Sequence, residues 1–215
     1  MTNEPTIESI QKYIHFLNSC IGSDVANIQP TVKLDDDTYK EELNNIGYQY
    51  YIKSAQDHYF VSRTLFMNYI FDYSLFSAYQ CIENYMKAFI KYKNHVPPLT
   101  HNLNELKGKC SELVTINDAF IDSMEFSTII YYYNPFYTMT RYPVSREMWV
   151  PRGHVHPNGI YVLDYFVMKF REMVALPEKM SDLLKENDST FILCKKHSPS
   201  FFNTFIQGNI NFLSQ

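Results

Sequence analysis

The chain has 215 residues, of which 46% are hydrophobic and 20% charged, so we expect a globular protein and not a fibrous or disordered one. It has only 6 glycines beside 18 tyrosines and 16 phenylalanines, and it contains neither G-x-G-x-x-G nor G-x-x-x-x-G-K-[ST], which argues against Rossmann and P-loop nucleotide sites. The net charge of −4 argues against a general nucleic-acid coat.

Cysteine spacing and apolar runs indicate the compartment. Cys20, Cys81, Cys110 and Cys194 are far apart and form no C-x-x-C, so we expect buried, reduced thiols and not disulfides or a zinc site. The first residues lack the basic and apolar regions of a signal peptide, and no apolar run approaches the roughly 20 residues of a membrane span. We therefore expect a cytoplasmic protein that does not associate with membranes.

The chain begins with a predicted short helix and a loop. Ile7, Ile10, Ile14 and Leu17 recur at helical spacing. Residues 20–40 contain a glycine, a proline and three consecutive aspartates, which is typical of a solvated loop.

Two long helices follow, each with one apolar stripe. The first stripe consists of Ile52, Ala55, Tyr59, Ser62, Phe66 and Tyr69. Asp72 is the expected cap of the second helix, whose stripe consists of Leu75, Tyr79, Ile82, Met86 and Phe89. Because the turn between them is short, the two helices should form an antiparallel hairpin.

Prolines and glycines divide the remaining chain. Pro97 and Pro98 should end the second long helix. A third helix is predicted over 103–113 and a fourth from about 117 to 133, with Pro135 ending or kinking it. Residues 141–159 predict a long loop.

The C-terminal part predicts two more helices. One begins near Gly159, buries Leu163, Phe166, Phe170 and Val174, and is ended or interrupted by Pro177. Residues 191–194 are β-like, and Ser198 and Pro199 predict the N-cap and the first residue of a short last helix.

These elements predict an all-α protein, an up-and-down bundle of four to five main helices with N- and C-terminal additions. We place an N-terminal helix and loop at 1–44, the bundle at 45–176 and a C-terminal extension at 177–215.

The second long helix also carries a polar stripe of Gln80, Glu83 and Lys87. Glu83 and Lys87 are an i,i+4 pair, which contributes a few tenths of a kcal/mol when exposed. Taken alone, this stripe is most simply interpreted as a solvated helix face.

The stripe occurs within an ordered series of motifs that resembles the HEPN domain family. The series comprises Ala55-x-Asp57, Gln80-x-x-Glu83-x-x-x-Lys87-Ala88, Thr100-His101-Asn102-Leu103 and Arg141-Tyr142-Pro143. The resemblance covers roughly residues 45–176. It departs from the family at Asn102, where aspartate is usual, and in a loop after Pro143 that resembles an insertion.

The resemblance implies a small helical bundle that is commonly a homodimer. The family includes ribonucleases of toxin–antitoxin and abortive-infection systems, partners of minimal nucleotidyltransferases, and domains thought to bind nucleotides or RNA without cutting them. We therefore expect a homodimer. The expected ligand is a nucleotide or RNA, and the expected protein partner is a nucleotidyltransferase.

The catalytic branch of the family carries an arginine and a later histidine with four to six residues between them. Such a pair suits metal-independent RNA cleavage, because histidine moves a proton and arginine stabilises the charged transition state. No arginine of this chain has a histidine at that spacing. A diverged nuclease could still use Arg141, Arg146 or Arg152 with His154 or His156.

The segment 141–156 is the best candidate for ligand contacts. It concentrates positive and aromatic side chains in an acidic chain, and the expected nucleotide or RNA contacts are Arg141, Tyr142, Arg146, Trp149 and Arg152. The alternative is a loop packed over the bundle, with its arginines paired to carboxylates.

Other histidines and tyrosines carry simpler interpretations. His154 and His156 could share one face of an extended segment, but no third ligand is evident, so we expect no metal and no cofactor. His101 is interpreted as a helix-start or packing residue, and His197 as a surface residue. At least one of Tyr131, Tyr132 and Tyr133 should be buried and another exposed, or at a dimer seam.

Three functions agree with the sequence. The first is a non-catalytic HEPN-like module that binds a nucleotide, RNA or a partner in a prokaryotic-type defence or toxin–antitoxin-like system. The second is a diverged metal-independent ribonuclease, and the third is a purely structural dimer.

Overall fold

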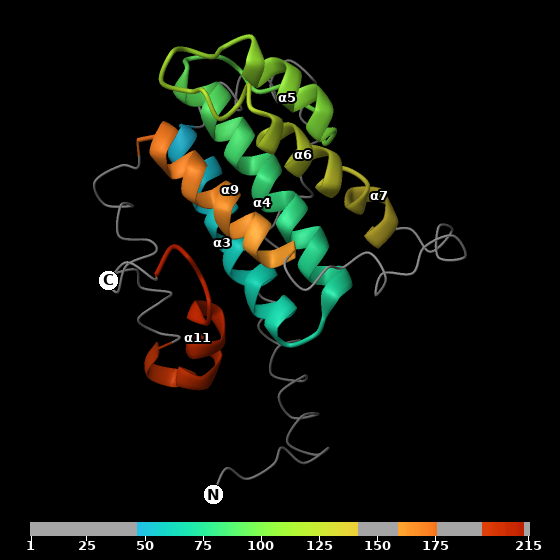
Figure 1. Cartoon of the computed structure of the whole chain (residues 1–215), viewed down its shortest axis with the longest axis vertical. Helices are drawn as coiled ribbons and strands as arrows, with labels where there is room; N and C mark the ends of the chain where they lie inside the picture. The colour runs from blue at the N-terminus through green and yellow to red at the C-terminus, as the bar shows by residue number, and fades with distance from the viewer. Residues whose placement is uncertain (1–46, 142–158, 176–194, 213–215) are drawn as a thin grey trace, which may run out of the picture. The chain divides into compact units, whose positions relative to one another are not determined.

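The structure, a computed structural model, describes residues 47–141, 159–175 and 195–212. Within these ranges it contains seven helices and no β-strand, so the all-α prediction is confirmed (Figure 1). The predicted N-terminal helix, the predicted loop at 20–40, the β-like stretch at 191–194 and residues 142–158 of the loop predicted over 141–159 lie outside the described residues. Arg141, the first residue of that predicted loop, is instead the last residue of a helix.

Helices α3 (Tyr48–Met67) and α4 (Phe71–Tyr92) form the predicted antiparallel hairpin. The α3 stripe is buried from Ile52 to Ser62 and the α4 stripe along its whole length. Tyr69 was predicted to be buried and is 82% exposed, because the helix ends at Met67.

The turn between the two helices explains this error. Tyr69 adopts a φ of 64°, and the amides of Tyr69 and Ile70 donate to the carbonyls of Phe66 and Leu65. This is a Schellman ending, which usually places glycine at the left-handed position. Asp72 was wrongly predicted to be the cap of α4: Ile70 occupies that position, and Asp72 lies in the first turn, where its charge favours the helix dipole.

Helix α4 ends in the same way, before the prolines predicted to stop it. Asn94 has a φ of 62°, and the amides of Asn94 and His95 donate to the carbonyls of Lys91 and Ile90. The backbone has therefore already left the helix when it reaches Pro97.

Three short helices follow: α5 (Leu103–Ser111), α6 (Met124–Tyr133) and α7 (Phe136–Arg141). The fourth predicted helix starts at Met124 and not near 117, with Ser123 as its cap. Residues 115–121 form turns instead, because the Asp118 carboxylate accepts from the amide and hydroxyl of Thr115 and from Lys93 Nζ. Pro135 separates α6 from α7, as predicted.

The last two helices are α9 (Gly159–Met173) and α11 (Pro199–Ile206). The predicted inner face of α9 is buried from Leu163 to Val174. Ser198 and Pro199 occupy the predicted cap and first positions of α11, although the Ser198 side chain makes no capping hydrogen bond. α11 packs on α3, where the rings of Phe60 and Phe205 lie 4.9 Å apart.

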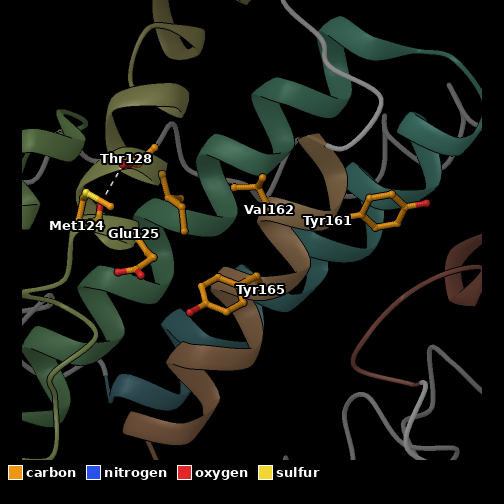
Figure 2. Close-up of a pocket in the computed structure, with 7 residues that line it drawn as sticks. Met124, Glu125, Thr128, Tyr161, Val162 and Tyr165 are labelled. Carbon is orange, nitrogen blue, oxygen red and sulfur yellow. Dashed lines mark hydrogen bonds between the residues drawn. The ribbon is translucent and has the colours of Figure 1, made fainter.

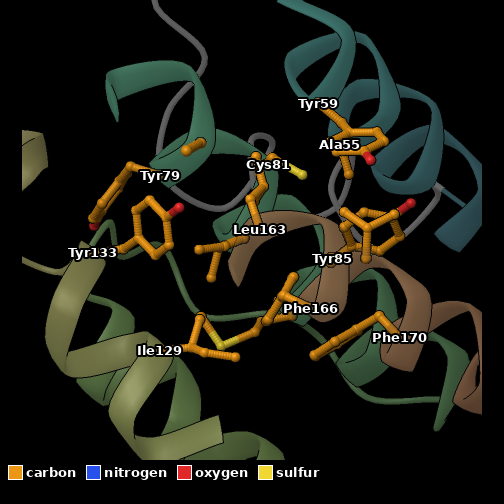
Figure 3. Close-up of a cluster of buried hydrophobic side chains, with 14 of the residues drawn as sticks. Ala55, Tyr59, Tyr79, Cys81, Tyr85, Ile129, Tyr133, Leu163, Phe166 and Phe170 are labelled. Carbon is orange, nitrogen blue, oxygen red and sulfur yellow. The ribbon is translucent and has the colours of Figure 1, made fainter. Parts of the chain in front are cut away.

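Helix α4 is the central element, because it packs against α3, α5, α6, α7 and α9. Figure 3 shows the core that results, with aromatic rings from α3, α4, α6 and α9. Phe126 of α6 stacks on Phe166 of α9, with an interplanar angle of 13°. Cys81 and Cys110 are buried and free, as predicted, and burial raises the pKa of both thiols.

The exposure of the three consecutive tyrosines, 131 to 133, differs as predicted. Tyr131 is exposed, Tyr132 is half-buried, and Tyr133 is buried with its hydroxyl donating to the carbonyl of Gly159. None of the described helices is both long and apolar enough to cross a membrane.

Candidate ligand-binding site

Residues from two of the sequence motifs meet where α4, the turn before α5 and α7 come together. Helix α4 carries Glu83 and Lys87, the turn carries His101, and α7 carries Tyr137 and, at its end, Arg141. Helix α4 packs directly against both α5 and α7, so the bundle itself brings these segments to one place.

Glu83 is the buried acid of this site. It is 3% exposed, its Oε1 lies 2.7 Å from Lys87 Nζ, and its two oxygens lie 3.0 and 3.1 Å from His101 Nδ1. A desolvated carboxylate is costly unless it is paired in this way. The interpretation of the stripe as a solvated face is therefore wrong at Glu83. Gln80, the third member of the stripe, is half-buried, and its backbone carbonyl accepts from Asn84 Nδ2.

The turn that presents His101 is held by its own side chains. Thr100 Oγ1 accepts from the amide of Asn102, and Asn102 Oδ1 accepts from the amide of Asn104. Asn102 thus caps α5 as an aspartate would, so its departure from the family motif preserves the local structure. The amide of Leu103 donates to Asn134 Oδ1, which ties this turn to the junction of α6 and α7.

Helix α7 covers His101 with an aromatic ring. The rings of His101 and Tyr137 are stacked, with centroids 5.0 Å apart and an interplanar angle of 14°. The Tyr137 ring also contacts Tyr79 and Phe76 of α4, at 5.3 and 6.5 Å. His101 was expected to be a helix-start or packing residue; it does precede α5 and does pack on Tyr137, and its ring also pairs with Glu83.

His58 is a neighbour of the site that sequence reasoning missed. It lies on α3, one residue after the Asp57 of the first motif, and it is half-buried. Burial lowers its pKa, while the charges of Asp57 and Glu83 oppose that effect. Asp57 itself is exposed and pairs with Lys53 at 2.9 Å. Ala55 and His58 are three residues apart and so lie close to one face of α3, and this spacing was the only feature of the sequence that pointed to His58.

Most of the predicted contact segment lies outside the residues that the structure describes. The predicted residues Tyr142, Arg146, Trp149, Arg152, His154 and His156 lie outside the described residues. Arg141 is the last residue of α7, four positions after Tyr137, so the two positions share one face of the helix. His197 is exposed, as predicted.

A second polar cluster lies inside the bundle and was not predicted. Arg63 of α3 and Asp164 of α9 are both fully buried, with Nη2 and Oδ2 3.4 Å apart. The Tyr59 hydroxyl donates to Asp164 Oδ1 at 2.6 Å. Burial raises the pKa of Asp164 from its ordinary 3.8 to about 6, although Arg63 and Tyr59 oppose the shift.

The C-terminal residues complete this second cluster. Arg63 Nη2 donates to the carbonyl of Gln207 at 2.6 Å, and the Asn211 amide donates to the Tyr59 hydroxyl and the Asp164 carbonyl. Residues 207–211 are therefore bonded into the bundle. The side chains of Tyr59, Arg63 and Asp164 are fully buried, so the cluster connects these C-terminal residues to the interior of the bundle.

Figure 2 shows a third feature, an open hollow of about 670 Å³ between α6 and α9. Its lining is mostly apolar and includes Met124, Thr128, Tyr161 and Tyr165. Glu125 is its charged residue. The hollow lacks the converging polar groups of the Glu83 site, and across the described ranges no group of three or more His, Cys, Asp or Glu side chains could hold a metal ion.

Comparison with known proteins gives one match. The family model described as the HEPN domain matches residues 48–153. This range contains all three segments of the Glu83 site. No significant match was found among curated proteins or among solved structures.

Proposed function

This chain carries a HEPN domain over residues 48–153, and from that premise we propose that it binds a nucleotide or RNA where α4, the Thr100–Asn102 turn and α7 meet. The observation that supports the proposal is the stack of Tyr137 on His101 beside the Glu83–Lys87 pair. Tyr137 belongs to α7, the helix that ends at Arg141, where the positively charged segment begins.

The segment after α7 is the proposed source of the main ligand contacts. Arg141, Arg146 and Arg152 supply guanidinium groups, which bind phosphate oxygens in pairs of hydrogen bonds. Tyr142 and Trp149 supply rings on which a base can stack. The chain has few glycines, so phosphate recognition would depend on these side chains and not on a glycine-rich loop.

Fluorescence anisotropy with a labelled single-stranded RNA and a labelled nucleotide tests this proposal. We expect salt-sensitive binding, and Arg141→Ala should weaken it at least about fivefold and reduce the salt dependence by roughly one phosphate contact. Lys196→Ala, which removes one exposed charge outside the site, is the matched control and should leave binding unchanged. Absence of salt-sensitive binding to both probes would overturn the proposal, and a gel of the same samples reports whether the RNA is cut.

A second copy of this chain is the proposed protein partner, at the apolar hollow between α6 and α9. Met124 and Tyr161 are large apolar side chains exposed at this hollow. Light scattering should report a dimer that Met124→Glu dissociates. Ile116→Glu is the control, because Ile116 is even more exposed than Met124 but does not line the hollow. A monomeric wild-type protein, or a dimer unaffected by Met124→Glu, contradicts this assignment.

The wider context is also a proposal. HEPN domains occur in toxin–antitoxin and defence systems, some beside a small nucleotidyltransferase, and we place this chain in a system of that kind. Co-expression with a nucleotidyltransferase encoded next to it, followed by size-exclusion chromatography, tests the pairing. Separate elution of the two proteins would contradict it.

A further inference from the structure

His101 is the outermost described ring of an aromatic stack that begins in the core. Tyr79 is buried in α4, Tyr137 of α7 lies against it, and His101 lies parallel to Tyr137. The ring planes of His101 and Tyr137 differ by only 14°, so the imidazole is covered over one face and not along its edge.

The other face of His101 remains accessible. Its side chain is 58% exposed, although one face lies on Tyr137 and Nδ1 is bonded to Glu83. Because Tyr137 covers one face and Glu83 pairs with one edge, the exposed surface of the ring lies on its remaining edge and its second face.

The ring is also held in position before any ligand arrives. Glu83 is buried and its two oxygens lie 3.0 and 3.1 Å from Nδ1, which fixes the edge of the ring. The hydrogen bonds of Thr100, Asn102 and Leu103 fix the backbone on both sides. A preorganised ring binds more tightly than a mobile one, because less side-chain entropy is lost on binding.

We infer that the open face of His101 is the stacking platform for a nucleobase, with Tyr137 supporting the ring from below and Glu83 fixing its edge. This inference rests on the proposed function and names the part of the ligand that the described residues recognise. A base suits the platform because it is flat and aromatic, and stacking tolerates any of the common bases. The base belongs either to a free nucleotide or to an unpaired position in RNA.

Competition binding with and without the base tests the inference. Wild-type protein with bound labelled RNA is titrated with AMP, with ribose 5-phosphate, and with RNA of the same length that carries one abasic position. We expect AMP to compete at least about fivefold better than ribose 5-phosphate if free nucleotides are the ligand. If RNA is the ligand, the abasic RNA should bind at least about fivefold more weakly than intact RNA.

Two substitutions of His101 separate stacking from hydrogen bonding. His101→Gln keeps a donor for Glu83 but loses the ring, so binding should weaken about 5- to 100-fold. His101→Phe keeps the ring and loses the donor, so it should retain most of the affinity. His95→Gln is the control, because His95 is exposed in the same connection and makes no contact with the site in the described structure.

A measurement on the wild-type protein keeps the test independent of folding defects. The ring protons of His101, assigned by their loss in His101→Gln, should shift upfield in NMR spectra on adding AMP or RNA and not on adding ribose 5-phosphate. Absence of any binding overturns the proposed function and this inference together. This inference alone is overturned if binding occurs but its affinity does not depend on the base, if His101→Gln does not weaken it, or if the His101 ring protons do not shift.

Discussion

The Nδ1 atom of His101 lies 3.0 Å and 3.1 Å from the two carboxylate oxygens of Glu83, a residue that is 18 positions earlier and almost fully buried. This pairing connects the central helix of the bundle to the turn before α5. Lys87 binds the same carboxylate at 2.7 Å. Glu83 thus joins two motifs that are separate in the sequence, the one on α4 and the one in the turn before α5.

Replacing Glu83 should therefore cost stability. Glu83→Leu leaves Lys87 half-buried without its partner and releases the His101 turn, so we expect a loss of about 2–3 kcal/mol in the free energy of unfolding, measured with urea. Asp57→Leu is the matched control, because Lys53 and Asp57 form the same i,i+4 pair on an exposed face and should contribute less than about 0.5 kcal/mol. Equal losses in the two variants would refute the structural role of Glu83.

The burial of Asp164 predicts a pH dependence with an unusual sign. Its pKa is raised from 3.8 to about 6, so the folded state binds more protons than the unfolded state between these values. The contribution of Asp164 to stability is therefore largest below about pH 4 and is lost as the pH rises through 6, by about 3 kcal/mol in all.

Urea unfolding at a series of pH values checks this sign. The difference in stability between wild type and Asp164→Asn should shift by about 2.5 kcal/mol in favour of the variant between pH 4 and pH 7, because asparagine cannot ionise. Other acids titrate in both proteins and cancel in the difference. A difference that stays constant with pH would show that Asp164 does not titrate in this range.

The C-terminal helix should contribute to the stability of the bundle. Phe205 is fully buried against Tyr59 and Phe60 of α3, so Phe205→Ala should cost about 3–5 kcal/mol. Phe201, on the exposed side of the same helix, is the control and should cost less than about 1 kcal/mol. Thermal unfolding followed by circular dichroism measures both, and similar melting temperatures for the two variants would contradict the packing of α11.

Glycine should be favourable at the two left-handed helix ends. Tyr69 and Asn94 have φ values of 64° and 62° at the Schellman position, where a side chain is strained. Tyr69→Gly and Asn94→Gly should each raise the free energy of unfolding by up to about 1 kcal/mol. Asn68→Gly, at a position with negative φ, should not stabilise the protein. Destabilisation by both of the first two variants would contradict this account.

Apolar periodicity was sufficient to predict the hairpin of α3 and α4, because burial of a stripe follows directly from its spacing. The inner face of α9 and the break at Pro135 were predicted for similarly local reasons. Helix ends were predicted less well. The predictions that Asp72 caps α4 and that Pro97 and Pro98 end it were wrong because backbone hydrogen bonds set those helix ends. The start of the fourth helix was wrong because Asp118 pairs with Thr115 and Lys93.

The motifs around Glu83, His101 and Arg141 were visible in the sequence, and their order was enough to indicate the HEPN family. What a sequence determines by itself is such local pattern: periodicity, spacing and residue type. Only the tertiary structure decided that Glu83 is buried, that His101 pairs with it and stacks on Tyr137, and that Arg63 and Asp164 hold the C-terminal residues in place. Burial and pairing depend on which helices pack together, and residues far apart in the chain meet only after that packing has formed.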